Sequence, residues 1–154
     1  MRIAVLADTH ADKLDYLPKK VTDALSTVDL IIHAGDFTDI QLLTDLKQLK
    51  EVKAVHGNMD SRQLKSVLPT KEIVETNDKR IGITHGSGSP WGMEERVRKP
   101  FESDRIDIIV YGHSHRSQNK VINHILFFNP GKAADSFGII TISGEAKGEI
   151  ISSR

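Results

Sequence analysis

Two nearly uninterrupted apolar segments constrain the fold of this 154-residue chain most strongly. The first covers residues 2–7 and reads Arg-Ile-Ala-Val-Leu-Ala, and the second covers residues 30–34 and reads Leu-Ile-Ile-His-Ala. Neither segment alternates polar and apolar residues, as a strand with one face in water does. We therefore predict that both are central strands of a sheet that is covered on both faces.

Helical spacing separates these strands and predicts a parallel first half of the fold. Apolar residues recur at helical intervals over residues 16–28, with Pro18 in the first turn, and again over residues 42–49. A third short strand is expected at residues 52–56. The order strand, helix, strand, helix, strand predicts right-handed crossovers and a parallel sheet.

After Pro69 the pattern changes to strands without intervening helices. Residues 71–76 and 80–84 predict an antiparallel pair, because the turn residues Asn77 and Asp78 join them and no helix lies between them. A short helix is expected at residues 93–98. Further strands are predicted at residues 107–111, 120–123, 125–129, 137–143 and 149–152. The fold class is therefore α/β with two packed sheets, in a single domain over residues 1–154.

Composition excludes several classes of function. The chain has no cysteine, so it has no disulfide, thiolate zinc site or thiol nucleophile. Its 21 Lys and Arg residues balance 21 Asp and Glu residues, which makes nucleic acid an unexpected stable partner. No apolar run is long enough to span a membrane, and the start does not resemble a signal peptide. We expect a cytoplasmic protein, and a homo-oligomer is compatible with the sequence.

Five predicted strands end in polar clusters that contain acids, imidazoles and an amide. In open α/β sheets ligands bind beyond the carboxyl ends of strands, so these clusters can meet in space. Each cluster alone is weak evidence, but about 0.02 occurrences of the last one are expected by chance from this composition. The clusters are Asp8-Thr9-His10, Gly35-Asp36, Gly57-Asn58, His85-Gly86 and Gly112-His113-Ser114-His115.

The chemistry of these side chains predicts a metal site. They offer oxygen and imidazole donors without sulfur, which suits Mn²⁺, Fe²⁺, Co²⁺, Ni²⁺ or Zn²⁺. Mn²⁺ is the first choice to test, although the sequence does not decide among them. Seven donors exceed the needs of one ion, and if Asp36 bridges, two divalent ions about 3.5–4 Å apart can share them. Two such ions and two aspartates leave a charge of about +2, which favours a phosphate-ester substrate.

With these motifs in this order, the sequence resembles the calcineurin-like metallophosphoesterase family from residue 3 to about residue 131. It is most similar to the small single-domain phosphodiesterases of bacteria and archaea, in which Asn-Pro-Gly also follows the last motif, here at residues 129–131. The resemblance implies a four-layer αββα sandwich of two mixed β-sheets flanked by helices. It also implies the ligands of each ion: Asp8, His10, Asp36 and His115 for one, and Asp36, Asn58, His85 and His113 for the other.

Two departures from the family pattern bear on the substrate. Met59 stands where the phosphomonoesterases of the family have a histidine that resembles a general acid. A diester or a leaving group of low pKa tolerates this loss better than an alkyl monoester does. Lys132 replaces the usual serine after Asn-Pro-Gly, and a cation near the mouth of the site would favour an anionic substrate.

We therefore predict a dinuclear-metal phosphodiesterase in which a hydroxide that bridges the ions attacks phosphorus. Asn58 would stabilise the non-bridging oxygens, and His85 or a water molecule would have to assist the leaving group. A phosphomonoesterase of the same mechanism is the first alternative. The second is a protein-binding scaffold similar to the small subunit of the eukaryotic retromer, which also carries the Pro-Trp-Gly sequence found here at residues 90–92.

Other polar residues near the motifs have structural interpretations as well. His33 and His56 could support ligands, donate a proton or form buried hydrogen bonds. For Asp60 and Ser61 a helix N-cap is expected. Trp91 could mark a partner surface, line the substrate cleft or pack beneath its loop. The basic residues at positions 96, 98 and 99 predict a solvated helix face.

Overall fold

The computed structural model describes residues 1–154, and its ten strands form two five-stranded sheets. The first sheet has the order β10-β9-β1-β2-β3, with β1 at Arg2–Leu6, β2 at Leu30–His33, β3 at Val52–Ala54, β9 at Ser136–Ser143 and β10 at Glu145–Ser152. The second has the order β4-β5-β6-β8-β7, with β4 at Lys71–Thr76, β5 at Lys79–Thr84, β6 at Ile108–Val110, β7 at Gln118–Ile122 and β8 at Ile125–Asn129.

Both sheets are mixed. Strands β1, β2 and β3 are parallel, as predicted, and β9 returns antiparallel to β1. In the second sheet β5, β6 and β8 are parallel, whereas the outer pairs β4–β5 and β7–β8 are antiparallel. The antiparallel pair predicted at residues 71–84 is therefore confirmed.

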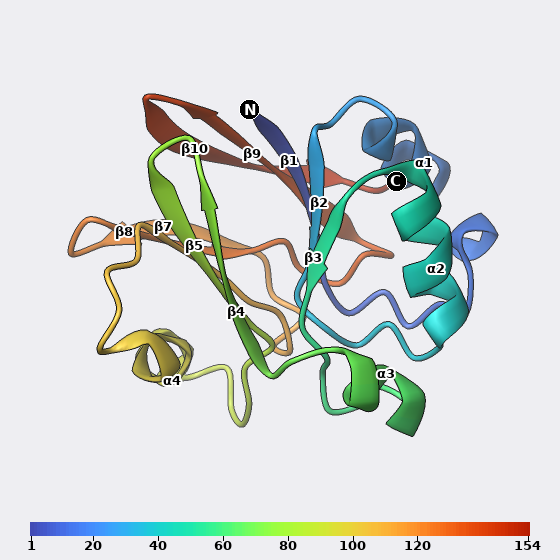
Figure 1. Ribbon diagram of the computed structural model, residues 1–154, viewed down its shortest axis with the longest axis horizontal. Helices are drawn as coiled ribbons and strands as arrows, with labels where there is room; N and C mark the ends of the chain where they lie inside the picture. The colour runs from blue at the N-terminus through green and yellow to red at the C-terminus, as the bar shows by residue number, and fades with distance from the viewer.

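Helices cover the outer face of each sheet, which gives the four layers seen in Figure 1. Helices α1, α2 and α3 lie beside the first sheet, and α4 lies beside the second. The helical segments are η1 at Leu14–Tyr16, α1 at Lys19–Leu25, α2 at Ile40–Leu49, α3 at Arg62–Val67, α4 at Met93–Arg98 and η2 at Lys99–Phe101. The longest has 10 residues, and none is both long and apolar enough to cross a membrane.

Three apolar clusters hold these layers together. Because side chains alternate along a strand, Ile3 and Val5 of β1 pack between the two sheets, whereas Ala4 and Leu6 pack against the helices α1 and α2. A third cluster joins α4 to the outer face of the second sheet. Both faces of β1 are buried, as its uninterrupted apolar sequence predicts, and the predicted αββα sandwich is confirmed.

Some predicted boundaries differ from the structure. The helix expected over residues 16–28 begins only at Lys19, because Pro18 is its extended N-cap residue and Leu17 before it is also extended. Strand β10 begins at Glu145 instead of residue 149 and pairs with β9 along its whole length. It is an edge strand with many exposed side chains, so its first half carries no continuous apolar signal.

The carboxyl ends of strands from the two sheets lie next to each other. The carboxyl ends of β1, β2 and β3 lie at one edge of the first sheet, and those of β5 and β6 lie at one edge of the second. The His85 imidazole of the second sheet donates to the Ala34 carbonyl of the first, with Nδ1 and the oxygen 2.7 Å apart. The loops after these five strands therefore meet at one place.

Candidate metal centre

The structure brings all seven predicted ligands together on the loops at this junction. They come from five loops, each directly after a strand: Asp8 and His10 after β1, Asp36 after β2, Asn58 after β3, His85 after β5, and His113 and His115 after β6. Four of them belong to the first sheet and three to the second. Neither sheet carries the whole set.

Left-handed backbone turns place most of these side chains. Five of the seven residues have positive φ angles: Asp8 at 49°, His10 at 45°, Asp36 at 60°, His113 at 66° and His115 at 57°. Such conformations are uncommon outside glycine and cost on the order of 1 kcal/mol each. Strain concentrated in one group of converging loops is typical of functional sites.

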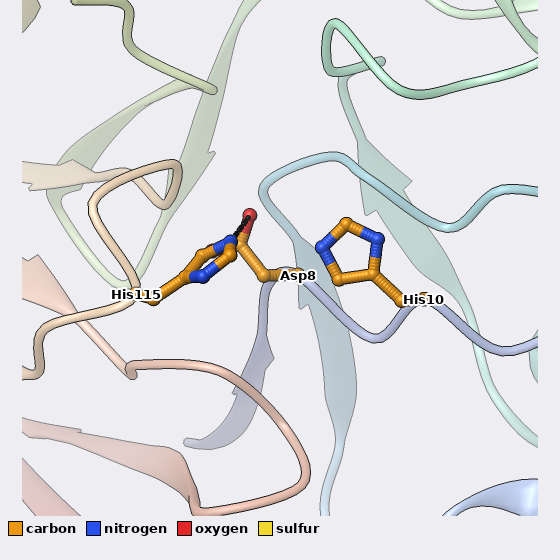
Figure 2. Close-up of side chains that lie close together, drawn as sticks. All are labelled: Asp8, His10 and His115. Atoms are coloured by element: carbon orange, nitrogen blue, oxygen red, sulfur yellow. Dashed lines mark ion pairs between the residues drawn. The ribbon is translucent and has the colours of Figure 1, made fainter.

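One half of the centre surrounds the buried carboxylate of Asp8. Figure 2 shows this side chain between the imidazole rings of His10 and His115, and the donor atoms of the three residues lie within 4.8 Å of one another. His115 Nε2 is 3.6 Å from Asp8 Oδ1. His10 Nε2 lies 3.9 Å from Asp36 Oδ2, so Asp36 also reaches this half.

The other half contains Asp36, His85, Asn58 and His113. His85 Nε2 lies 3.3 Å from Asp36 Oδ2 and 3.1 Å from Asn58 Oδ1. His113 Nδ1 lies 3.3 Å from the same Asn58 oxygen. Asp36 therefore stands between His10 and His85, which is the position expected of a bridging ligand. Asp8 also reaches both halves, because its Oδ1 lies 3.9 Å from His85 Nε2.

Backbone carbonyls orient two of the imidazoles toward the centre. The Nδ1–H of His85 donates to Ala34 O, and the Nε2–H of His113 donates to Gly88 O at 3.1 Å. The other nitrogen of each ring then faces the neighbouring ligands: His85 Nε2 lies near Asp36 and Asn58, and His113 Nδ1 lies near Asn58. A carbonyl that fixes the tautomer in this way is a common partner of a metal-binding histidine.

Of the two carboxylates, Asp8 lacks enough nearby positive charge to compensate for its burial, whereas Asp36 is compensated by His85. Burial raises the pKa of Asp8 to about 7, and the charge of Asp36 adds to the rise, while His85 and the His113 N–H lower it. For Asp36 the hydrogen bond and charge of His85 outweigh burial and hold the pKa below its usual range. The same contacts raise the pKa of the His85 imidazole despite burial. A cation between these groups would supply the missing charge.

The donor set fits divalent ions. Two donors that each lie about 2.1 Å from one ion are separated by roughly 3.0–3.4 Å. The carboxylate and imidazole atoms here are 3.3–3.9 Å apart, close to that range. In addition, His10 Nε2 is buried and has no hydrogen-bond partner, although buried polar atoms nearly always have one. A bound ion would give that nitrogen its partner.

Asp60 is a structural residue of the site whose role the sequence did not predict. Its carboxylate, in a residue 6% exposed, accepts the backbone N–H groups of Gly57 at 2.7 Å, Thr38 at 2.8 Å and Asp36 at 3.0 Å. It thus fastens the loop of Asp36 to the loop of Asn58. A helix N-cap was expected for Asp60 and Ser61, and Ser61 alone forms it, because its Oγ accepts the Leu64 N–H. In the sequence, the signal for this role was the position of the aspartate, two residues after the predicted ligand Asn58.

A second buried network supports the loop after β2. His33 is fully buried, accepts the Gly35 N–H at Nδ1 and contacts Thr9 Oγ1 through Nε2 at 3.1 Å. Thr9 in turn donates to the Asp36 carbonyl at 3.3 Å. Burial lowers the pKa of His33 to about 3, so the ring is neutral. Of the roles considered for His33, buried hydrogen bonding that supports the ligand loop is the one found.

Asn129 fixes the loop after β6. Its amide nitrogen donates to the Gly112 carbonyl and to Ser114 Oγ, and its oxygen accepts the Gly131 N–H. Gly112 is required here, because a Cβ at this position would come within 2.9 Å of the Asp8 carboxylate. The Asn-Pro-Gly segment therefore positions the loop of His113 and His115.

Three other predicted features lie around the centre. The Met59 side chain is 59% exposed, while its N–H donates to Asp36 Oδ1. Lys132 lies near enough to His115 that its charge, after burial and His10, helps to lower the pKa of that ring. Trp91 is 77% exposed, so it does not pack beneath its loop.

Of the residues predicted on a solvated helix face, Lys99 is exposed and Arg98 is half-buried. Arg96 is also half-buried and has a second role. Its guanidinium donates to the carbonyls of Ser87, Ser89 and Trp91 and thereby holds the loop before α4. The side chain can do so because the loop folds back over the first turn of the helix, a contact that helical periodicity does not reveal.

Comparison with known proteins agrees with this geometry. Residues 1–143 match the family model of the calcineurin-like phosphoesterase superfamily domain. A probable metallophosphoesterase of Methanocaldococcus jannaschii is 44% identical over 133 residues, which cover 85% of this chain and 67% of the relative. A phosphodiesterase of the same organism is 28% identical over 159 residues, covering 92% and 90%. The structure of Vps29 from Chaetomium thermophilum shares the fold, with a TM-score of 0.81 at 20% identity over 98% and 97% of the chains.

Proposed function

Because this chain belongs to the calcineurin-like phosphoesterase superfamily, we propose that it is a dinuclear metal-dependent hydrolase of phosphodiesters. The observation that carries the proposal is the convergence of two buried carboxylates and four imidazoles, two of which have their protonated nitrogen fixed on a backbone carbonyl. Asp8, His10, Asp36 and His115 would hold one ion, and Asp36, Asn58, His85 and His113 the other.

Two divalent ions held there would lower the pKa of a water molecule to near neutrality and supply positive charge to the transition state. The residues of the chain position these groups. Asp60 and His33 hold the loop of Asp36, and Asn129 holds the loop of the last two histidines. Asn58 Oδ1 faces the rings of His85 and His113, which leaves its amide nitrogen free to donate to a non-bridging phosphate oxygen.

The preference for diesters rests on Met59. Its thioether cannot donate a proton to a leaving alkoxide, and His85 has its Nδ1–H engaged with Ala34. A substrate that needs little protonation of its leaving group is therefore favoured. The relative that is named a phosphodiesterase supports the same preference.

The test compares bis(p-nitrophenyl) phosphate with p-nitrophenyl phosphate in the presence of Mn²⁺ or Ni²⁺, together with elemental analysis of the protein. We expect about two ions per chain and faster hydrolysis of the diester. Faster hydrolysis of the monoester would reverse the substrate preference. No hydrolysis of either ester by protein with bound metal would refute the enzymatic function.

A protein-binding scaffold is the second candidate, and the exposed Trp91 is the observation that favours it. Arg116 lies over the indole ring, 5.9 Å from its centre. A scaffold does not need a complete set of metal ligands. If the protein hydrolyses neither ester and binds a protein partner that Trp91→Ala no longer binds, the scaffold is favoured over the enzyme.

A further inference from the structure

A cavity of about 370 Å³ opens beside the metal centre. Asn58 and His85 line it, so the cavity is continuous with the half of the centre that contains these two residues. The other lining residues come from the loops after β3 and β5, from α3, α4 and η2, from the residue before β4 and from the end of β5, and none of them is of a hydrophobic type. Its volume is at the lower end of the range of small-molecule sites.

The cavity is positively charged. Lys65 and Arg96 line it, and no aspartate or glutamate does. Neither cation has a carboxylate within 4.0 Å. Lys65 Nζ donates to the Asn58 carbonyl at 3.1 Å, which occupies one of its three N–H groups. Arg96 is held in place by three loop carbonyls, none of which carries a negative charge.

Hydroxyl groups complete the lining. Thr84 at the end of β5, Thr70 and Ser87 are among the lining residues, and the Thr84 hydroxyl donates to the Thr70 carbonyl at 3.5 Å. Hydroxyls and ammonium groups without a nearby carboxylate are suited to bind the oxygens of an anion.

A simple diester does not carry enough negative charge to pair with both the metal centre and the cations of the cavity. Its single phosphate carries one negative charge, which two divalent ions already attract. Lys65 and Arg96 would then face a neutral substituent. A second phosphate on the same substrate would pair with them and would lie next to the metal centre.

We propose that this cavity binds a second phosphate group of the substrate, so that the substrate is a phosphodiester with an additional terminal phosphate. This inference rests on the proposed function, because it takes the metal centre as the place of the scissile phosphate. Lys65 is the residue that contacts the second phosphate directly, and Arg96 contributes charge and holds the loop of Ser87.

The test uses two chromogenic esters that differ in one group. The first is the p-nitrophenyl ester of thymidine 5′-phosphate, and the second carries an additional 3′-phosphate. We expect kcat/KM of the wild-type protein to be about tenfold higher for the second ester, the effect of one charge-assisted hydrogen bond. In Lys65→Met this preference should fall to about threefold or less.

A control and a binding measurement complete the design. Lys47→Met makes the same change in net charge on the exposed side of α2 and should retain the tenfold preference. Calorimetry with thymidine 5′-phosphate and thymidine 3′,5′-bisphosphate in Mn²⁺ needs no turnover. We expect the bisphosphate to bind about tenfold more tightly to the wild type, and Lys65→Met to remove most of that advantage.

The outcomes separate this inference from the proposed function. Hydrolysis of both esters with equal efficiency, together with equal binding of both nucleotides, overturns the second phosphate site and leaves the phosphodiesterase intact. Release of inorganic phosphate from the second ester before p-nitrophenol also overturns it, because the terminal phosphate would then lie at the metals. Hydrolysis of neither ester refutes the proposed function, whereas a binding advantage that Lys65→Met removes would still support the cavity as a phosphate site.

Discussion

Replacement of Asp60 by asparagine tests how the ligand loops are held. The carboxylate accepts three backbone N–H groups, two at Oδ2 and one at Oδ1. In its best orientation Asn keeps the two bonds at Oδ2 and turns its amide NH₂ toward the Thr38 N–H. One hydrogen bond to a charged acceptor is lost, which costs about 1.5–3 kcal/mol of stability. Asp60→Ala leaves all three donors without this partner and should cost roughly 3–5 kcal/mol.

The same substitution should weaken metal binding. The loops of Asp36 and Asn58 are joined through Asp60, so their ligands lose their fixed separation. We expect the affinity for Mn²⁺ to fall by roughly 10–100-fold, the usual effect of altering a group that orients metal ligands.

Two assays measure these effects. Urea denaturation of EDTA-treated protein gives the free energy of unfolding, and calorimetric titration gives the Mn²⁺ affinity. Asp23→Asn is the matched control, because it removes an exposed ion pair with Lys19 that contributes less than about 1 kcal/mol. If Asp60→Asn unfolds within about 0.5 kcal/mol of the wild type and binds Mn²⁺ equally well, Asp60 does not hold the two loops together.

Three further substitutions address the centre and its support. Asp36→Asn should lower the Mn²⁺ affinity by more than about 100-fold, beyond the effect of an orienting group, and elemental analysis should find fewer than two ions per chain; an unchanged metal content would contradict the bridging role. Gly57→Ala places a Cβ against Asp36 Oδ1 and should cost about 1–3 kcal/mol in urea denaturation, so equal stability would show that the loops can separate freely. His33 has a pKa of about 3 when folded and near 6.5 when unfolded, so its contribution to stability is complete above pH 6.5 and is lost as pH falls toward 3. Between pH 6 and 5 the free energy of unfolding of the metal-free wild type should therefore decrease relative to His33→Gln by up to about 1.4 kcal/mol per pH unit, and parallel pH profiles of the two proteins would contradict a neutral buried ring.

Most of the sheet architecture could be predicted because the burial of a strand determines its pattern of polar and apolar residues. Strand β1 packs on both faces, and its sequence has no polar alternation. Strand β10 lies at an edge with alternating exposure, and only its second half could be predicted. Helix α1 begins after Pro18 because the proline ring imposes its own restriction on the residue before it.

The candidate ligands could be found because they follow strands whose carboxyl ends share one edge. Their supporting residues could not, because hydrogen bonds between loops leave no periodic pattern. Asp60 binds N–H groups 22–24 residues earlier in the chain as well as one nearby. Arg96 binds carbonyls of a loop whose path depends on its own packing. The charge of the cavity beside Asn58 also required the fold, since Lys65 and Arg96 are 31 positions apart in a chain of zero net charge.

The division of the ligands between two sheets has a consequence for folding. Residues up to Asn58 contribute four donors and the later segments contribute three, so an isolated half of the chain offers an incomplete coordination shell. Tight uptake of two cations therefore requires that the hydrophobic layer between the sheets has already closed. Metal occupancy would then report completion of the native state, and a higher cation concentration would increase the free energy of unfolding of that state.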